Sequence, residues 1–219
     1  MEDTSAQPIS GLIADSSALP VNKKPAARQA RSMTTKRAVL DAATQLFAEK
    51  GYEDTSVDEI VQASGVSLGS MYHQFGGKLE VFLALAQEVL NRHAAASVRA
   101  SNRAAHARPA DPVAAYVAGA HAFLMSVWED RGITRIMIGE GPAGYSVMRH
   151  EALDRFRHGT EGLTMGDPPL PDSTGYAVTA MTQAAAMQIV DVHDRRTAEL
   201  VADYFMDLLT HLFASGSTV

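Results

Sequence analysis

A short run of small and polar residues could form the surface that hydrogen-bonds another molecule. It holds two serines, a glycine, a tyrosine, a histidine and a lysine close together: Ser67, Leu68, Gly69, Ser70, Tyr72, His73 and Lys78. Hydroxyl, imidazole and ammonium groups bind phosphate oxygens, and small side chains let a backbone approach the edges of bases. The pattern therefore predicts a nucleic-acid contact, with residues 67–70 at base edges and Tyr72, His73 and Lys78 at phosphates.

The elements that must position this surface are two short helices separated by a tight turn. Ser56 and Glu59 have the spacing of a capping box, which satisfies backbone donors at a helix start. Gly65 tolerates the positive φ that the turn requires, and Ser67 can cap the second helix. Apolar residues at helical spacing face the core on both helices: Val57, Ile60, Val61, Met71 and Phe75. This arrangement predicts a helix-turn-helix whose second helix lies in the major groove of DNA.

The run from Gly65 to Lys78, GVSLGSMYHQFGGK, resembles the DNA-binding signature of the TetR family of bacterial transcriptional regulators. The preceding segment, TTKRAVLDAATQLFAEKGYEDTSVDEI, is also similar, so the resemblance covers residues 34 to 85. Leu68 departs from the polar residue or proline that is common at its position. The resemblance implies a ligand-responsive repressor with phosphate contacts from Tyr72 and Lys78. It also implies a small hydrophobic effector, and a homodimer that forms through the last two helices and binds a palindromic operator.

The charge of the chain is unevenly distributed along the sequence. The formal net charge is −6, which by itself would oppose binding to DNA. However, six basic residues and no acidic ones lie between positions 23 and 37: Lys23, Lys24, Arg28, Arg31, Lys36 and Arg37. The sequence thus predicts positive charge beside the helix-turn-helix, with Arg37, Thr55 and Ser56 as flanking DNA contacts.

Hydrophobic periodicity predicts an all-α chain in three parts. Residues 1–32 are polar and lack periodicity, so we expect a disordered basic tail. Residues 33–80 form the DNA-binding domain, whose first helix spans about residues 34–50. Residues 81–219 form an effector-binding and dimerisation domain, and a long helix that opens near Lys78 joins it to the head.

The two last helices, expected over residues 172–193 and 196–214, carry an unusually wide apolar stripe. The second of them repeats apolar pairs, from Leu200/Val201 to Leu212/Phe213. A stripe of this width fits a four-helix bundle across a two-fold axis. The alternative is a helix buried within a monomer.

Bulky, adaptable side chains between residues 100 and 190 could line an apolar effector pocket. The candidates are Phe123, Trp128, Met137, Tyr145, Met148, Phe156 and Met181. The alternative is that each of them belongs to an ordinary hydrophobic core.

Two enzyme motifs also occur. Residues 65–69 match G-x-S-x-G, which in hydrolases follows a strand, and residues 139–144 match the dinucleotide fingerprint G-x-G-x-x-G, which needs a βαβ unit. A capped helix precedes the first motif and no series of strands is evident, so we predict no enzyme activity. A helical ligand-binding or chaperone-like module remains an alternative, as does a hydrolase that uses Ser67.

The rest of the sequence argues against disulfides, membrane spans and metal sites. The chain has no cysteine, no apolar run of membrane-spanning length and no histidine pair at metal-binding spacing. We therefore expect a cytoplasmic protein without a membrane contact, a metal or a cofactor.

Overall fold

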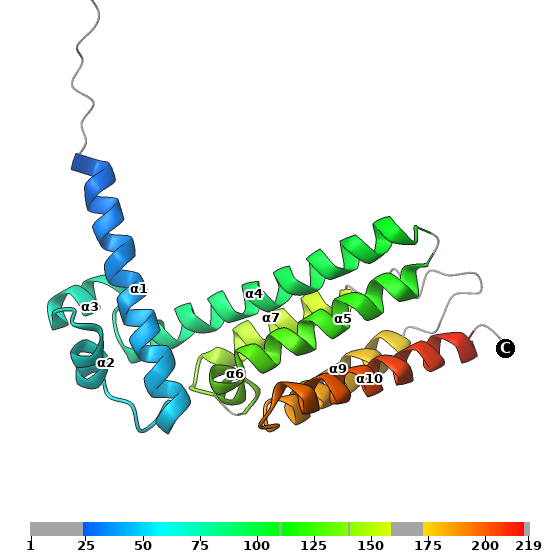
Figure 1. Ribbon diagram of the computed structural model, residues 1–219. Coiled ribbons are helices and arrows are strands. Elements are labelled where there is room, and N and C mark those ends of the chain that lie inside the picture. Colours follow the sequence, from blue (N-terminus) through cyan, green and yellow to red (C-terminus); the bar gives the residue numbers. More distant parts are fainter. Residues whose placement is uncertain (1–23, 110, 140, 159–172, 217–219) are drawn as a thin grey trace, which may run out of the picture.

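The computed structural model describes residues 24–109, 111–139, 141–158 and 173–216. Within these ranges the regular elements are all helices, as the sequence predicts. In chain order they are α1 (Lys24–Lys50), α2 (Val57–Ser64), α3 (Leu68–Gln74), α4 (Lys78–Ala107), α5 (Pro112–Glu129), α6 (Arg131–Ile138), α7 (Tyr145–His158), α9 (Ser173–Ile189) and α10 (Arg195–Gly216). Figure 1 shows α1, α2 and α3 grouped at one end, with the other helices extending away from them.

The three-helix head is connected to the body by α4, which is continuous over 30 residues. This helix starts beside the head and runs along α5, its antiparallel neighbour in the body (Figure 1). The start of α5 is fixed locally, because Asp111 Oδ1 accepts a hydrogen bond from the Ala114 amide at 2.8 Å and Pro112 occupies the first turn. The expected helical head, long connecting helix and helical body are thus confirmed.

The first helix is longer than the sequence pattern predicts. It begins at Lys24 instead of about Thr34, so residues 24–32 of the expected disordered tail belong to α1. Hydrophobic periodicity cannot detect a helix that lacks a stripe of large apolar residues, and residues 24–32 (KPAARQARS) contain none. Residues 1–23 of the expected tail lie outside the described part of the chain.

Two hydrophobic clusters divide the interior. The head core cluster joins residues of α1–α3 to the first half of α4 and to Ile133, Met137 and Tyr145 of the body. The body core cluster is formed by α5, α9 and α10, with Leu124, Ile189 and Leu209 fully buried. The head core therefore extends beyond the boundary expected near residue 80.

Aromatic rings connect the head to the body through this shared core. The Phe82 ring of α4 lies 5.8 Å from the Phe47 ring of α1 and 5.5 Å from the Tyr145 ring of α7, measured between centroids. A second link is the approach of α6 to α1, where a Cβ placed on Gly132 would lie only 2.7 Å from the Cβ of Ala48. Head and body thus pack against each other directly as well as through α4.

Candidate nucleic-acid interface and ligand cavity

The turn between α2 and α3 is built from the local signals seen in the sequence. Ser56 caps α2, because its hydroxyl accepts from the Glu59 amide at 3.2 Å while Glu59 Oε2 accepts from the Ser56 amide at 2.8 Å. Lys50 of α1 also contacts Glu59, and this hydrogen bond, with those from Ser56, lowers the pKa of Glu59 to about 2. Gly65 ends α2 with φ 66°. The helix-turn-helix is thus tied to α1 at its outer end.

The face of α3 expected to meet DNA is open to solvent. Leu68 is 44% exposed and Tyr72 is 49% exposed, and Ser67, Gly69, Ser70 and His73 are exposed as well. Met71, on the opposite side of the same helix, is fully buried in the head core cluster. Ser67 caps α3 by accepting from the Ser70 amide at 3.2 Å. The structure therefore brings the predicted contact residues of α3 together on one surface.

Gly69 is exposed on this face, and none of the described residues requires its lack of a side chain. A Cβ at this position would have no heavy atom within 4 Å. Glycine in a helix costs about 1 kcal/mol relative to alanine. An empty space above Gly69 therefore suits the close approach of a partner's surface.

Two of the predicted DNA contacts, Thr55 and Lys78, make hydrogen bonds within the head. Thr55 is only 2% exposed, and its hydroxyl donates to the Gly51 carbonyl at 2.7 Å, so it holds the turn after α1. The ammonium of Lys78 donates to the carbonyls of Tyr52 and Glu53 at 2.8 and 3.2 Å and lies 4.2 Å from the Tyr52 ring centroid. Thr55 is thus a correction, because a buried hydroxyl cannot reach DNA, and Lys78 is already occupied in the free protein.

The other flanking candidates remain on the surface. Ser56 is exposed, although its hydroxyl and amide both bind Glu59. Arg37 is exposed and forms ion pairs with Asp41 at 2.9 Å and with Glu88 at 3.6 Å. Its guanidinium would have to leave these carboxylates to bind a phosphate.

The extended start of α1 is attached to the recognition helix. The Gln74 side-chain amide donates to Ser32 Oγ at 2.8 Å, and Ser32 Oγ lies 3.2 Å from Gln74 Oε1. This contact places the exposed Arg31 beside the end of α3. Sequence reasoning missed the contact because the two residues are 42 positions apart.

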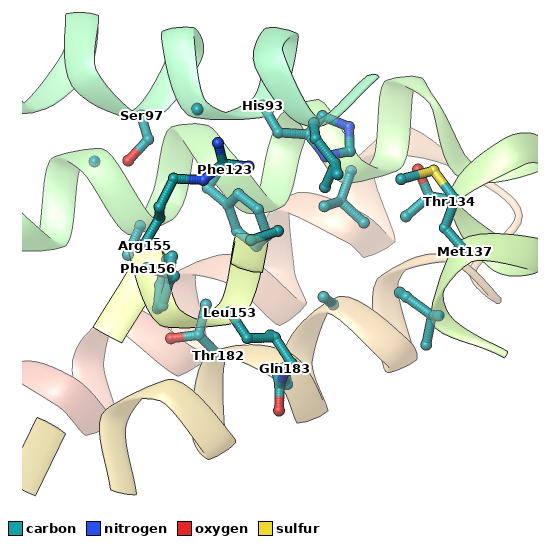
Figure 2. A pocket seen from close by; sticks show the side chains of 18 of the residues that line it. His93, Ser97, Phe123, Thr134, Met137, Leu153, Arg155, Phe156, Thr182 and Gln183 are labelled. Carbon is teal, nitrogen blue, oxygen red and sulfur yellow. The ribbon is translucent and has the colours of Figure 1, made fainter. Parts of the chain in front are cut away.

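A cavity of about 690 Å³ lies in the body, lined by α4, α5, α6, α7 and α9. This volume is within the range of about 300–1,000 Å³ that is usual for small-molecule sites. Four predicted pocket residues line it: Phe123, Met137, Tyr145 and Phe156. Figure 2 shows three of these with polar side chains that the sequence did not single out, among them Ser97, Thr182 and Gln183.

The other three predicted pocket residues lie elsewhere. Trp128 packs against the body core cluster, and Arg131 lies 4.7 Å from its ring centroid. Met181 also packs against the body core cluster, and Met148 packs against the head core cluster. These three residues therefore pack in or against the hydrophobic cores, which is the alternative that the sequence left open.

The cavity lies close to a polar cluster of Arg92, His93 and Asp130 at the junction of α5 and α6, in which His93 is buried and Arg92 is exposed. His93 of α4 is 3% exposed, and its Nε2 lies 3.2 Å from Asp130 Oδ2, off the line of a hydrogen bond. Arg92 Nε donates to the same oxygen at 2.8 Å. Burial opposes ionisation of Asp130, but His93 and Arg92 outweigh it and hold the pKa of Asp130 below its usual value.

The two enzyme motifs lie in helical surroundings. Ser67, the serine of G-x-S-x-G, caps α3 on the surface, and a helix, not a strand, precedes it. Residues 139–144 follow α6, which also replaces the strand that a dinucleotide site needs. Among the described residues, no group of three or more His, Asp or Glu side chains could hold a metal ion. None of the described helices combines the length and apolar character needed to cross a membrane.

Comparison with known proteins places the head in a family. The pattern that defines "Bacterial regulatory proteins, tetR family" matches residues 39–85. The HTH-type transcriptional repressor AcnR of Corynebacterium efficiens is 40% identical over 58 residues, which are 26% of this chain and 31% of that protein. The HTH-type transcriptional repressor Rv1474c of Mycobacterium tuberculosis is 42% identical over 64 residues, 29% of this chain and 34% of that one. The matched region thus spans about a third of the length of these relatives.

Solved structures resemble most of the chain in fold. NalD of Pseudomonas aeruginosa, a repressor of a multidrug efflux pump, superposes with a TM-score of 0.66 at 21% identity, covering 83% of this chain and 96% of that one. PfmR of Thermus thermophilus, a TetR family transcriptional regulator, superposes with a TM-score of 0.56 at 26% identity, covering 78% and 96%. These two proteins are described as a repressor and as a transcriptional regulator. Residues 39–85 thus match the tetR family of bacterial regulatory proteins, and the helical body behind this head shares the fold of solved regulators.

Proposed function

We propose that the chain is a repressor that binds a palindromic operator as a homodimer and is released by a small effector in the body cavity. The observation that carries the DNA-binding part is the exposed polar face of α3, opposite the fully buried Met71. Base edges are contacted from Ser67, Leu68, Gly69 and Ser70, at the start of the recognition helix. Phosphates are contacted by Tyr72 and His73 and, from the start of α1, by Arg31.

Fluorescence anisotropy with DNA from the control region of the chain's own gene tests this interface. We expect His73→Ala and Arg31→Ala each to weaken binding and to reduce the salt dependence by about one phosphate contact, a slope change of about 0.9 in log K against log salt concentration. Arg103→Ala is the matched control, because Arg103 is exposed on α4 outside the head. Unchanged affinity and salt slope in both head variants would refute the phosphate contacts.

Lys78 needs a different experiment, since its ammonium already binds two carbonyls. We propose that Lys78 acts on DNA by fixing the turn between α1 and α2. Lys78→Ala is then expected to lower thermal stability together with DNA affinity. Lower affinity with unchanged stability would support the direct phosphate contact instead.

Dimerisation is supported by apolar side chains that the described chain leaves uncovered. The large exposed apolar residues of α9 and α10 are Tyr176, Met187, Leu200, Tyr204, Leu208 and Leu212. In α10 they recur every four residues, which places them on one face of that helix. A row of exposed apolar side chains along one helix face is typical of protein interfaces. We propose that α9 and α10 of two copies form a four-helix bundle across a two-fold axis.

Light scattering with size-exclusion chromatography tests the dimer. Leu200→Asp combined with Tyr204→Asp places two charges at the centre of the proposed bundle, so we expect a monomer that binds the operator weakly. Val147→Asp is the matched control, because Val147 is also an exposed apolar residue but lies on α7. A dimer that survives the double substitution would overturn this interface.

The effector role rests on the position of the cavity beside the head. Met137 and Tyr145 line the cavity and also belong to the head core cluster. A ligand that displaces either side chain therefore acts on residues that the head uses for its own packing. Changing the ratio of two states from about 1:99 to 99:1 requires roughly a 10⁴-fold preference of the ligand, about 5.5 kcal/mol.

Repression is proposed from the relatives named AcnR and Rv1474c, both of which are described as repressors. A relative matched over a similar length, FasR of Mycolicibacterium smegmatis, is described as an activator. A reporter fused to the control region decides between the two. Deletion of the gene raises reporter expression if the protein represses, and lowers it if the protein activates.

A further inference from the structure

The chemistry of the cavity walls indicates which class of molecule it accepts. The inference rests on the proposed function, in which the cavity holds the effector. Three properties carry it: the sign of the charge around the cavity, the hydrogen-bonding groups that the protein leaves without partners, and the apolar surface between them.

The charged side chains at the cavity are basic. Its lining includes Arg149 and Arg155, and none of the described lining residues is Asp or Glu. Arg155 makes no hydrogen bond or ion pair in the described part of the chain. Figure 2 shows its side chain extending from α7 toward the α4 side of the cavity, where Ser97 lies. Arg155 is also exposed, so among the described residues nothing occupies its guanidinium at the solvent-accessible side of the cavity lining.

The cavity lining also contains a hydroxyl without a hydrogen-bond partner. Thr134 is 4% exposed, and its Oγ1 makes no hydrogen bond to any described residue. Thr44, Thr182 and Thr210 instead donate to the carbonyl four residues earlier in their helices. An unsatisfied buried hydroxyl costs about 1–3 kcal/mol. The hydroxyl of Thr134 lines the cavity, so a polar group of a ligand can satisfy it.

Tyr116 adds a second such hydroxyl on α5. Its oxygen is buried without an aligned hydrogen bond. Burial raises the pKa of Tyr116 above its usual value, and the nearby Thr182 hydroxyl offsets part of this increase. The described chain has four buried side-chain polar atoms without a hydrogen bond. Three of them belong to residues that line the cavity, namely Tyr116, Thr134 and His93. Their concentration here indicates a built binding site, since a packing defect would be lined by apolar groups.

The surface between these polar points is apolar and aromatic. The Phe156 ring of α7 lies 5.5 Å from the Phe123 ring and 6.5 Å from the Tyr116 ring, measured between centroids. Leu153 and Met137 continue this surface. A ligand must therefore bring an apolar body as well as a polar group.

We propose that the cavity binds an amphipathic organic anion, a carboxylic acid with an apolar body, and that Arg155 pairs with the carboxylate. The fixed fork of a guanidinium suits the two oxygens of a carboxylate. The apolar body lies against Phe123 and Phe156. Neutral molecules of the same shape gain the apolar contacts only, and cations are repelled by Arg155 and Arg149.

Isothermal titration calorimetry on the full chain tests this with three probes that share one tail: decanoate, 1-decanol and decylamine, each below its aggregation concentration. We expect decanoate to bind roughly tenfold or more tightly than 1-decanol, as suits a charge-assisted contact, and decylamine to bind most weakly. Arg155→Glu should reverse the order, so that decylamine binds more tightly than decanoate, with 1-decanol unchanged.

Two controls keep the result specific. Arg103→Glu makes the same charge change on an exposed arginine outside the cavity, and should leave all three affinities unchanged. Thermal unfolding should be the same for Arg155→Glu and the wild type, because Arg155 has no hydrogen-bond or ion-pair partner among the described residues.

The outcomes separate this inference from the proposed function. Equal binding of the three probes, or a preference that survives Arg155→Glu, overturns the anion assignment, while release of the operator by any of them still supports an effector cavity. Binding that depends on Arg155 without any loss of operator affinity supports the anion assignment and refutes the regulatory role. If none of the three binds, the anion assignment is overturned as well.

Discussion

The contact between α1 and α6 offers a sharp test of how the head is held against the body. A Cβ added to Gly132 would lie 2.7 Å from the Cβ of Ala48. Carbon atoms in contact prefer a separation of about 3.5–4.0 Å. Gly132→Ala therefore forces α1 and α6 roughly 1 Å apart at this point, unless one of the helices shifts along the other.

Two effects of opposite sign set the magnitude. Alanine is favoured over glycine in a helix by up to about 1 kcal/mol, whereas overpacking a close contact costs about 1–3 kcal/mol. We expect a net destabilisation of about 1–2 kcal/mol. For a chain of this size that lowers the midpoint of thermal unfolding by about 2–8 °C. Operator affinity should fall as well, because α1 carries Val39, Leu40 and Phe47 of the head core cluster.

A double-mutant cycle identifies the contact as the cause. Ala48→Gly removes the opposing methyl group, so Gly132→Ala should cost little in that background, with a coupling free energy of about 1–2 kcal/mol. Thermal unfolding followed by circular dichroism measures all four proteins, and anisotropy measures their operator affinities. A Gly132→Ala protein as stable as the wild type, with no coupling to Ala48→Gly, would refute close packing of α1 on α6.

Three further predictions use single sites. Gly69→Ala should raise thermal stability by up to about 1 kcal/mol. It should also weaken operator binding about tenfold or more, since a misfit in a protein–DNA contact costs about 1–3 kcal/mol. Unchanged affinity would show that DNA does not approach this glycine. Thr55→Val should lower the unfolding midpoint, by removing the hydrogen bond to Gly51, yet leave the operator affinity of the folded protein unchanged. The pKa of Asp130 is lower in the folded protein than the usual carboxyl pKa near 4, so ionised Asp130 stabilises the fold at pH values above 4. This stabilisation is lost as the pH falls from 4 through the lowered pKa of the folded protein. Asp130→Asn should therefore reduce stability at pH 7 and flatten the acid side of the stability–pH curve, and an unchanged curve would contradict the polar cluster.

The helix-turn-helix was predictable because its signals are local. A capping box, a glycine at positive φ and a capping serine determine where α2 and α3 begin and end, and each of them acts within a few residues. The same holds for α5, which Asp111 and Pro112 start where the sequence indicates. These signals need no knowledge of distant contacts.

The roles of Thr55 and Lys78 were not predictable because they depend on distant or competing acceptors. Both residue types hydrogen-bond phosphates, and a pattern cannot tell whether a backbone carbonyl has already taken the donor. Lys78 finds its acceptor at Tyr52, 26 positions away. The start of α1 was not predicted for a related reason. This part of the helix carries no apolar stripe and is supported by the contact between Ser32 and the distant Gln74.

The cavity shows the same limit more strongly. Aromatic and methionine residues were reasonable candidates, yet Trp128, Met148 and Met181 fill cores while Phe123 and Met137 line the cavity. All five have similar side-chain chemistry, and only the packing of helices decides which of them faces an empty space. Arg155 carried no signal in the sequence, because a single arginine on an exposed helix is ordinary.

The position of the cavity explains why its contents should matter to the head. Tyr145 lines the cavity, and its ring packs edge-on against Phe82, which in turn packs against Phe47 of α1. Close-packed rings transmit a displacement because there is no free volume to absorb it. We infer that a ligand large enough to displace Tyr145 must change how α4 packs against α1. Two heads on one operator tolerate little change in their spacing, since successive major grooves lie about 34–36 Å apart.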